Sequence, residues 1–394
     1  MNIVFLLRFW PIYGGGETVT RILANKLVES GYAVSIIYLW DKRQEDMPFI
    51  DKRITEYRIP DVLIDKHVGI HKNDYSVIIN HLRSFLAVKN MDVIINQWLP
   101  PKVVYKANAG LVKKAKIICC CHTAVIPPRY VLTLKHKLFY FIFGKYGMKF
   151  RYYVIKNRLK DRVRYSDRWV FLTQYSLEEA KSLFKTNADI MRVIPNPLTY
   201  NYFASETEIE RKDKEVLYVG RVDAGKRLQY LIYAWSMIEQ NARVSDWHLT
   251  IVGNGPDLES VKAYARQLRC ERVFFKGAQI PVEYYKRAAL FALTSGSEGF
   301  PMVLTEAQQF GCVPVVMDSF SSLHEIVINN NNGIIIKNND IQGFAEALER
   351  LMLDENYRLH LALGGLESCK RFSIDNVLRQ WEALFYEVAE NNRI

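Results

Sequence analysis

Residues 291–316 read FALTSGSEGFPMVLTEAQQFGCVPVV and contain the elements around which the rest of the chain can be placed. The first residues are apolar and predict a buried strand, and the Ser- and Gly-rich segment after them predicts a loop that carries Glu298. Pro301 suits the first position of a helix, because its missing N–H would be unsatisfied there in any case. The helix is predicted to run to Phe310, and Gly311 ends it before the next buried strand, VPVV.

The two glutamates of this stretch suggest a binding site. A helix N-terminus presents unpaired backbone N–H groups and the positive end of the helix dipole, so the segment from Glu298 to Val303 can hold an anion or sugar hydroxyls. Glu306 lies roughly 7–8 Å further along the helix axis. Two such carboxylates could bind two parts of one elongated, polyhydroxylated ligand. The alternative is an ordinary helix with a favourable acid at its start and a surface glutamate inside it.

Length and composition favour a globular protein with phosphate-rich partners. The chain has 394 residues, 49% of them hydrophobic, which is enough for two domains that each have a core. The formal net charge of +11 favours a nucleotide, a nucleic acid or an anionic membrane surface as partner. No apolar run reaches the ~18 residues of a membrane-spanning helix. The N-terminal stretch is interrupted by Arg8 and predicts a strand rather than a signal peptide.

The six cysteines do not predict a metal site. Cys119, Cys120 and Cys121 are adjacent, and His122 follows them. Successive strand residues point to opposite faces of a sheet, so the three thiols cannot bind one ion together, and no CxxC spacing occurs. We expect a reduced cytoplasmic protein without a metal.

The first half of the chain opens with a strand, a glycine-rich turn, a helix and a second strand. The strands are expected at residues 2–9 and 33–39, with the motif YGGGE and a helix at residues 18–30 between them. This order is typical of the phosphate-binding turns of doubly wound folds. It is not the dinucleotide fingerprint, because no third Gly or Ala follows Gly16 at the required place. A plain tight turn is the alternative.

Further strands are predicted in this half at residues 77–80, 92–96, 116–121, 168–172 and 191–194. His122 comes directly after one of them, where α/β sheets place ligands. A lone histidine is more often structural, so its position alone leaves both roles open.

Residues 129–168 are unusually basic and aromatic. They contain 12 Lys and Arg against two acids, Asp161 and Asp167, with rings such as Phe141 and Tyr153 interleaved. The cations could meet anionic headgroups while the rings enter the membrane interface, which is the partner that we expect for this segment. Single-stranded nucleic acid stacked on the rings, and a buried helix pair with a solvated basic face, are the alternatives.

The βα pattern restarts after residues 204–215, a charged segment without core residues that reads as a linker. A strand is predicted at residues 216–219, and Arg221 follows it. Lys226 then opens a helix. Two cations between a strand and a helix form a good diphosphate site.

Several motifs of this half resemble those of the retaining glycosyltransferases of family four, which have the GT-B fold. They are VGRVDAGKRL, VGNGPDLE, FKG, SGSEGFPMVLTEAQQFGCVPVV and EIVINNNNGIII. In the first half, YGGGE, CHT and PNP fit the same pattern. The resemblance spans most of the chain, and the two glutamates separated by seven residues are its most specific part.

The resemblance implies an α/β protein with two Rossmann-like, doubly wound domains that face a central cleft. Residues 1–198 would form the acceptor domain and residues 199–394 the nucleotide-sugar donor domain, with the last helix packing back on the first domain. Pro197 and the pair Ser321-Ser322 stand where the family often has glycine, which leaves the local loop geometry open.

The resemblance also implies roles for individual residues. Arg221 and Lys226 would bind the donor's diphosphate and offset the charge that develops on it as the glycosidic bond breaks. Glu306 would accept hydrogen bonds from the ribose. His122 would lie near the sugar and the reacting carbon. The donor sugar would be held by Glu298 and the residues Gly299, Phe300, Pro301, Met302 and Val303, and the backbone of Gly15 and Gly16 would approach the phosphate or the acceptor.

The activity so implied is a metal-independent transfer, with retention, of a sugar from UDP or GDP. No cofactor besides this co-substrate is expected. The acceptor would be a lipid-linked saccharide in surface polysaccharide or glycolipid assembly, made on the cytoplasmic face of the membrane and without nucleic acid. The alternatives are a soluble transferase of the same fold with a small acceptor and a non-catalytic nucleotide-sugar-binding protein.

Overall fold

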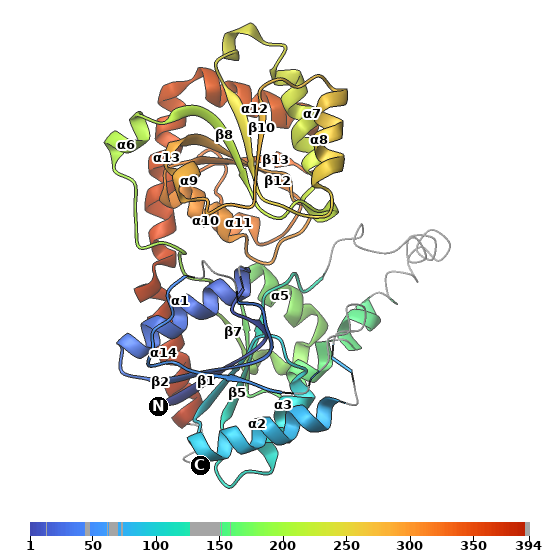
Figure 1. Cartoon of the computed structure of the whole chain (residues 1–394), viewed down its shortest axis with the longest axis vertical. Helices are drawn as coiled ribbons and strands as arrows, with labels where there is room; N and C mark the ends of the chain where they lie inside the picture. The colour runs from blue at the N-terminus through green and yellow to red at the C-terminus, as the bar shows by residue number, and fades with distance from the viewer. Residues whose placement is uncertain are drawn as a thin grey trace. The chain divides into compact units, whose positions relative to one another are not determined.

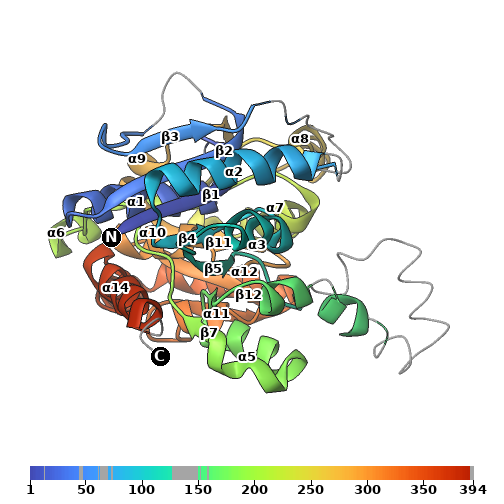
Figure 2. The ribbon, with the colours of Figure 1, turned by 90° about the horizontal axis from the view of Figure 1, so that it is seen from below.

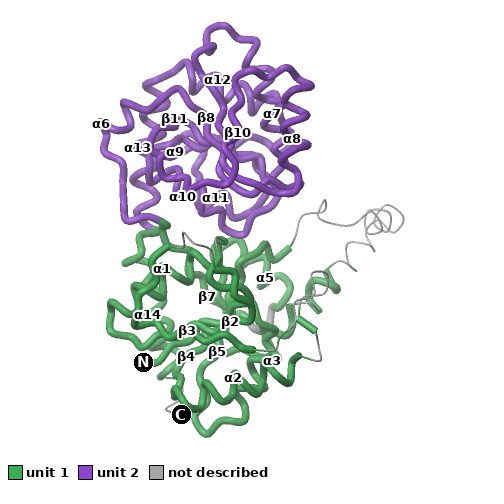
Figure 3. Tube along the Cα trace, viewed as in Figure 1, with its two compact units in different colours: residues 1–126, 134–199, 372–394 green, residues 127–133, 200–371 purple. Residues whose placement is uncertain are grey.

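The chain forms two compact α/β units in the computed structural model (Figures 1 and 3). Unit 1 takes its described residues from 1–126, 150–199 and 372–390, and unit 2 from 200–371. The structure describes residues 1–12, 14–43, 48–60, 62, 70–71, 74–126, 150, 152–157 and 159–390.

The described part of unit 1 is built on a seven-stranded sheet in which every recorded pairing is parallel. Its strand order is β3-β2-β1-β4-β5-β6-β7, so β4 is the central strand and β1 lies beside it. The strands are β1 (Asn2–Trp10), β2 (Ala33–Asp41), β3 (Thr55–Arg58), β4 (Val93–Asn96), β5 (Lys116–Cys121), β6 (Arg168–Phe171) and β7 (Met191–Val193).

Helices cover both faces of this sheet. Alternate residues of β1 point to opposite faces, so Phe5 packs with one helix group and Leu6 with the other. The first group is α1 (Gly15–Glu29) and α14 (Ile374–Glu390); the second is α2 (Tyr75–Lys89), α3 (Pro101–Ala109) and α5 (Gln174–Leu183). Within the second group, α2 and α3 lie side by side (Figure 2).

The strand predicted at residues 77–80 is wrong, because these residues belong to α2. The buried residues of α2 are Ile78, Leu82 and Leu86, which recur every four positions and so mark one face of a helix. The short apolar run VII resembles a strand only when the sequence after it is ignored.

Unit 2 contains a second parallel sheet, six-stranded in the described residues, with the order β10-β9-β8-β11-β12-β13. Its strands are β8 (Asp213–Val219), β9 (His248–Val252), β10 (Val273–Gly277), β11 (Ala288–Leu293), β12 (Val313–Asp318) and β13 (Ile334–Lys337). Its main helices are α7 (Leu228–Ile238), α8 (Leu258–Gln267), α9 (Val282–Arg287), α10 (Met302–Gln309), α11 (Leu323–Ile326), α12 (Ile341–Leu353) and α13 (Glu355–Cys369).

The segment predicted as a linker, residues 204–215, is partly ordered structure. It contains α6 (Glu206–Glu210), which starts with a capping box formed by Ser205 and Glu208, and it includes the start of β8. Capping satisfies the first backbone groups with polar and charged side chains, and Ile209 is buried at 7% exposure, so this mostly charged segment still forms a helix.

The C-terminal helix α14 belongs to unit 1, although the residues before it belong to unit 2. Val377, Trp381 and Phe385 are buried against the face that α1 also covers. Glu387 pairs with Arg168 of β6 at 2.7 Å and also with the neighbouring β7 arginine. The end of the chain therefore completes the core of unit 1.

Candidate functional site

Two neighbouring strands of unit 2, β8 and β11, end beside each other and carry the loops that hold the predicted donor residues. The loops are joined by backbone: the Gly296 N–H donates to the Gly225 carbonyl at 2.8 Å. The buried Thr294 hydroxyl donates to the carbonyls of Lys226 at 3.0 Å and Arg227 at 3.1 Å. These bonds fix the backbone from which Lys226 projects.

Lys226 and Glu298 meet between these loops. The Lys226 ammonium donates to Glu298 Oε1 at 2.5 Å, and the two side chains are only 25% and 14% exposed. An ion pair that water does not fully surround is screened less than a surface pair. The structure therefore brings together a cation and a carboxylate that are 72 positions apart in the sequence.

Arg221 is placed differently. It follows β8 but is 71% exposed and pairs with Asp223 at 3.4 Å. Its carbonyl accepts a hydrogen bond from the buried Tyr218 hydroxyl at 2.9 Å, which anchors the backbone and leaves the guanidinium in solvent.

The backbones of the turns after β8 and β9 lie very close to each other. Gly253 has a φ of +149°, and a Cβ there would lie 1.8 Å from the Gly220 carbonyl oxygen. Only glycine allows the turns after β8 and β9 to approach so closely. The motifs that the sequence showed as separate glycine turns thus form one packed unit.

Helix α10 begins directly after the Glu298 loop. Pro301 is its N-cap rather than its first helical residue, and Phe300 and Met302 are buried while Gly299 and Val303 are half-buried. Residues 299–303 thus surround a helix N-terminus whose first N–H groups lack intrahelical partners.

Glu306, on α10, is only 7% exposed, so the alternative of an ordinary surface glutamate is wrong. Its Oε2 accepts a hydrogen bond of 2.8 Å from the Tyr285 hydroxyl. Glu306 is held on the buried side of α10, whereas Glu298 lies on the loop before it.

In unit 1, the glycine turn is shorter than predicted, because α1 already starts at Gly15. Gly14 is its N-cap and has no side chain to satisfy the first N–H groups. A Cβ on Gly16 would lie 3.1 Å from the indole Nε1 of Trp98, so glycine lets this ring approach the start of α1.

His122 follows β5 and contacts the side chains after β4. Its Nε2 lies within hydrogen-bonding distance of Gln97 Oε1, and its ring lies 5.5 Å from that of Trp98. Burial lowers the pKa of His122 to about 4, so the imidazole is neutral at neutral pH. It can donate and accept hydrogen bonds there but carries no charge.

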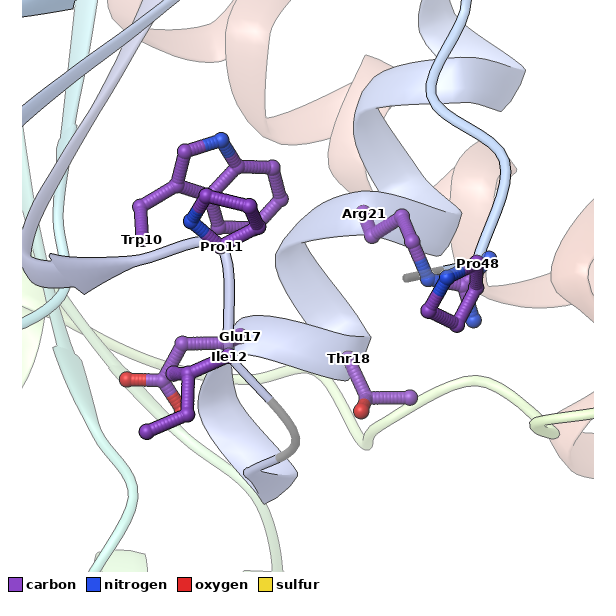
Figure 4. Close-up of a pocket in the computed structure, with 7 residues that line it drawn as sticks. All are labelled: Trp10, Pro11, Ile12, Glu17, Thr18, Arg21 and Pro48. Carbon is purple, nitrogen blue, oxygen red and sulfur yellow. The ribbon is translucent and has the colours of Figure 1, made fainter. Parts of the chain in front are cut away.

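A small pocket opens beside the start of α1 (Figure 4). It is lined by Trp10, Pro11, Ile12, Glu17, Thr18, Arg21 and Pro48. Burial raises the pKa of the Glu17 carboxyl above its ordinary value. An acid and an apolar wall therefore flank the glycine turn.

Sequence reasoning missed Gln97, Trp98 and Tyr285. The first two could have been found, because they directly follow the strand before that of His122 and parallel strands end at one edge. Nothing in the sequence marked Tyr285, which lies on a different helix from Glu306.

Within the described residues, no group of three or more His, Cys, Asp or Glu side chains is arranged to hold a metal ion. In the same part of the chain, no helix is long and apolar enough to cross a membrane. The predicted membrane segment, residues 129–168, lies outside the described residues over 129–149.

Two family models match consecutive parts of the chain. Residues 13–200 match Glycosyltransferase Family 4, and residues 203–365 match Glycosyl transferases group 1.

Curated relatives carry related names. A Haemophilus influenzae protein named "Uncharacterized glycosyltransferase" is 25% identical over 381 residues, which cover 94% of this chain and 96% of the relative. The lipopolysaccharide 1,6-galactosyltransferase of Escherichia coli is 29% identical over 43% of this chain and 48% of its own. A Campylobacter jejuni transferase, named for adding N-acetyl-D-galactosamine to an undecaprenol-linked saccharide, is 24% identical over 50% of this chain and 55% of its own. The last two matches span about half of each relative.

Solved structures match the whole fold. The lipopolysaccharide outer core galactosyltransferase WaaB aligns with a TM-score of 0.69 at 19% identity, over 98% of this chain and 99% of the other. Anabaena HepE in complex with UDP and glucose aligns with a TM-score of 0.73 at 15% identity, over 98% of this chain and 100% of the other. Two parallel-sheet units, two matching family models and these folds agree, and the chain belongs to the family-four glycosyltransferases, with the GT-B fold.

Proposed function

We propose that the protein transfers a sugar, with retention of configuration and without a metal, from a nucleoside diphosphate sugar to a lipid-linked or saccharide acceptor. The observation that carries the proposal is the contact of Lys226 with Glu298 beside the N-terminus of α10. A diphosphate needs cations and N–H donors, and a sugar needs carboxylate acceptors. The residues at the ends of β8 and β11 supply both.

Lys226 would act on the diphosphate. Its backbone is fixed by Thr294, so its ammonium can contact the diphosphate without a large loss of conformational entropy on binding. The charge on the leaving diphosphate rises as the glycosidic bond breaks, and a preorganised cation stabilises that state more than the ground state. Arg221, which extends into solvent, would close on the diphosphate when the donor arrives.

Glu298 would hold sugar hydroxyls and would not attack the anomeric carbon. Its Oε1 is engaged by Lys226 at 2.5 Å, which lowers its nucleophilicity and ties its position to the diphosphate. Retention would follow from attack of the acceptor on the face that the diphosphate leaves, with a phosphate oxygen taking the acceptor's proton. Gly15, Gly16 and the neutral His122 of unit 1 would line the acceptor and sugar.

The acceptor class rests on relatives and on an exposed aromatic surface. The E. coli and C. jejuni relatives are named for lipopolysaccharide and for undecaprenol-linked saccharide. In unit 1, Tyr152, Tyr153 and Val154 are 43%, 63% and 46% exposed, and the exposed Lys156 and Lys160 lie on the same helical segment. Exposed rings and cations close together in the chain suit an anionic membrane surface on its cytoplasmic side.

A thermal-shift panel of UDP, GDP and their sugars tests the donor. A ligand that binds only the folded state raises Tm by mass action, so base and sugar are identified together. Glu298→Ala should abolish transfer and keep nucleotide binding within about threefold, whereas Glu259→Ala, an exposed acid on α8, should change neither. Transfer by Glu298→Ala at the wild-type rate would contradict the proposal.

Liposome flotation tests the membrane surface. Vesicles with anionic lipid should recover the wild-type protein at low salt, and Tyr152→Ser/Tyr153→Ser should reduce recovery. Tyr233→Ser, which removes a ring of 43% exposure from α7 of unit 2, is the matched control. Equal recovery of all three proteins would argue against this surface and favour a soluble acceptor.

A further inference from the structure

Tyr285 donates a hydrogen bond to the buried acid of α10, Glu306. It lies on α9, is 0% exposed, and donates its hydroxyl to Glu306 Oε2 at 2.8 Å. A buried carboxylate requires such a donor, because an ion without hydrogen bonds in the interior costs several kcal/mol.

The surroundings of Tyr285 hold its ring in one place. The ring stacks on Phe310 with centroids 5.7 Å apart and an interplanar angle of 12°, and it contacts Phe291 at 6.0 Å. The Tyr285 carbonyl accepts hydrogen bonds from the Lys212 ammonium at 2.7 Å and from the Cys312 thiol at 3.1 Å. With both ring and backbone restrained, the hydroxyl is a fixed donor.

The hydroxyl also keeps its proton. Burial, and then the charge of Glu306, raise the pKa of Tyr285 well above its ordinary value. The hydroxyl therefore remains protonated, and can donate to Glu306, at neutral pH.

We propose that Tyr285 is a positioning residue that orients the Glu306 carboxylate toward the ribose hydroxyls of the donor and so determines the preference for ribonucleotides over deoxyribonucleotides. The inference rests on the proposed function and on the role that the family resemblance implies for Glu306, which is to accept hydrogen bonds from the ribose. One oxygen of the acid is bonded to a fixed tyrosine, so the orientation of the carboxylate is restrained before the nucleotide arrives. A site built to accept hydroxyls rejects analogues that lack them, because its polar groups are then left without partners.

The test compares nucleotide affinities by calorimetry. UDP, GDP and the 2′-deoxy and 3′-deoxy form of each are titrated separately. The proteins are the wild type, Tyr285→Phe, Glu306→Gln and the variant that carries both changes. The wild type should bind the ribonucleotide about tenfold tighter than a deoxy form. Tyr285→Phe should weaken ribonucleotide binding about five- to tenfold and deoxynucleotide binding less than about twofold. In the Glu306→Gln background, Tyr285→Phe should cause little further loss of ribonucleotide affinity.

Tyr202→Phe is the matched control. Tyr202 stacks on the same Phe310 at 4.7 Å, and its hydroxyl donates to a carboxylate, that of Glu208, at 2.7 Å. Its loss removes a tyrosine–carboxylate bond, at the surface, from the same aromatic cluster and should leave the preference for ribose unchanged. A change in the preference for Tyr202→Phe equal to that for Tyr285→Phe would overturn the inference.

The outcomes separate the inference from the proposed function. If the wild type discriminates, Glu306→Gln loses discrimination and Tyr285→Phe retains it, only the positioning role fails. If the wild type does not discriminate, or binds neither UDP nor GDP, the ribose role of Glu306 fails and the inference fails with it. Donor kinetics add a further check: Tyr285→Phe should raise KM more than it lowers kcat, whereas a merely misfolded site would lower kcat with the fraction of active enzyme.

Discussion

Lys226 and Glu298 hold each other at 2.5 Å, so substituting either side chain leaves a partly buried charge without this partner. Lys226→Ala should weaken binding of a nucleoside diphosphate about 10- to 100-fold, because a charge-assisted contact to the diphosphate is lost. Calorimetry measures this. Lys262→Ala, which removes a half-buried cation paired with the exposed Glu259, should bind as the wild type does. Equal affinities for both variants would show that Lys226 does not reach the diphosphate.

His122 predicts a dependence of stability on pH. Its pKa is about 4 in the folded protein, below the ordinary value of 6.5, so the unfolded chain binds the proton more readily. The free energy of unfolding therefore does not depend on protonation of this histidine above about pH 6.5. It falls as pH drops from about 6.5 toward 4, by at most about 3 kcal/mol.

Urea unfolding at pH 7 and pH 5 measures this effect through the difference between the wild type and His122→Asn. The variant should lose less stability on acidification, because it has no imidazole to protonate. His324→Asn, which changes a histidine that is 38% exposed, should follow the wild type. Parallel curves for all three proteins would remove His122 as the cause.

At the level of elements, the turns after β8 and β9 depend on Gly253. Gly253→Ala combines a φ of +149° with a Cβ 1.8 Å from the Gly220 carbonyl, so the two turns must separate. We expect a loss of more than about 2 kcal/mol, and weaker nucleotide binding because Arg221 follows the same turn.

Gly277→Ala is the matched control for this clash. It also has a positive φ, +70°, but no atom lies within 4 Å of its added Cβ. It should cost about 1–2 kcal/mol from backbone strain alone. Chemical denaturation compares the two, and equal losses would mean that the close approach of the turns is not what requires glycine.

Element prediction failed where a short segment was interpreted without the residues around it. The buried residues of α2 recur every four positions, yet the run VII within it resembles a strand. The charged residues around Ser205 look like a linker because helix α6 is short, starts with a capping box and buries a single apolar residue, Ile209. In both cases the neighbouring residues, rather than the local composition, decide the structure.

At the level of the whole molecule, α14 links the end of the chain to the core of unit 1. Trp381→Ala should destabilise this unit by about 3–5 kcal/mol, because the side chain is 5% exposed among Val377 and Phe385. Hydrogen exchange should therefore increase in β1 and α1. Nucleotide affinity, which we assign to unit 2, should stay within about twofold.

Gln380→Ala, an exposed change on α14, is the control for this prediction and should leave exchange unchanged. If Trp381→Ala instead accelerated exchange mainly in β8 and β11, the assignment of α14 to the core of unit 1 would be wrong.

The sequence by itself determined two successive βα halves, the glycine turns at their strand ends, and the helix that follows Glu298 and carries Glu306. It also determined the resemblance to family-four glycosyltransferases, which the comparisons confirmed. These features are local: they depend on side-chain period and on turn residues within about 15 positions. Only the tertiary structure decided that Lys226 touches Glu298, that Tyr285 holds Glu306 and that α14 completes unit 1. Such contacts join residues far apart in the chain, and it is the packing of whole strands and helices, which no local pattern encodes, that brings them together.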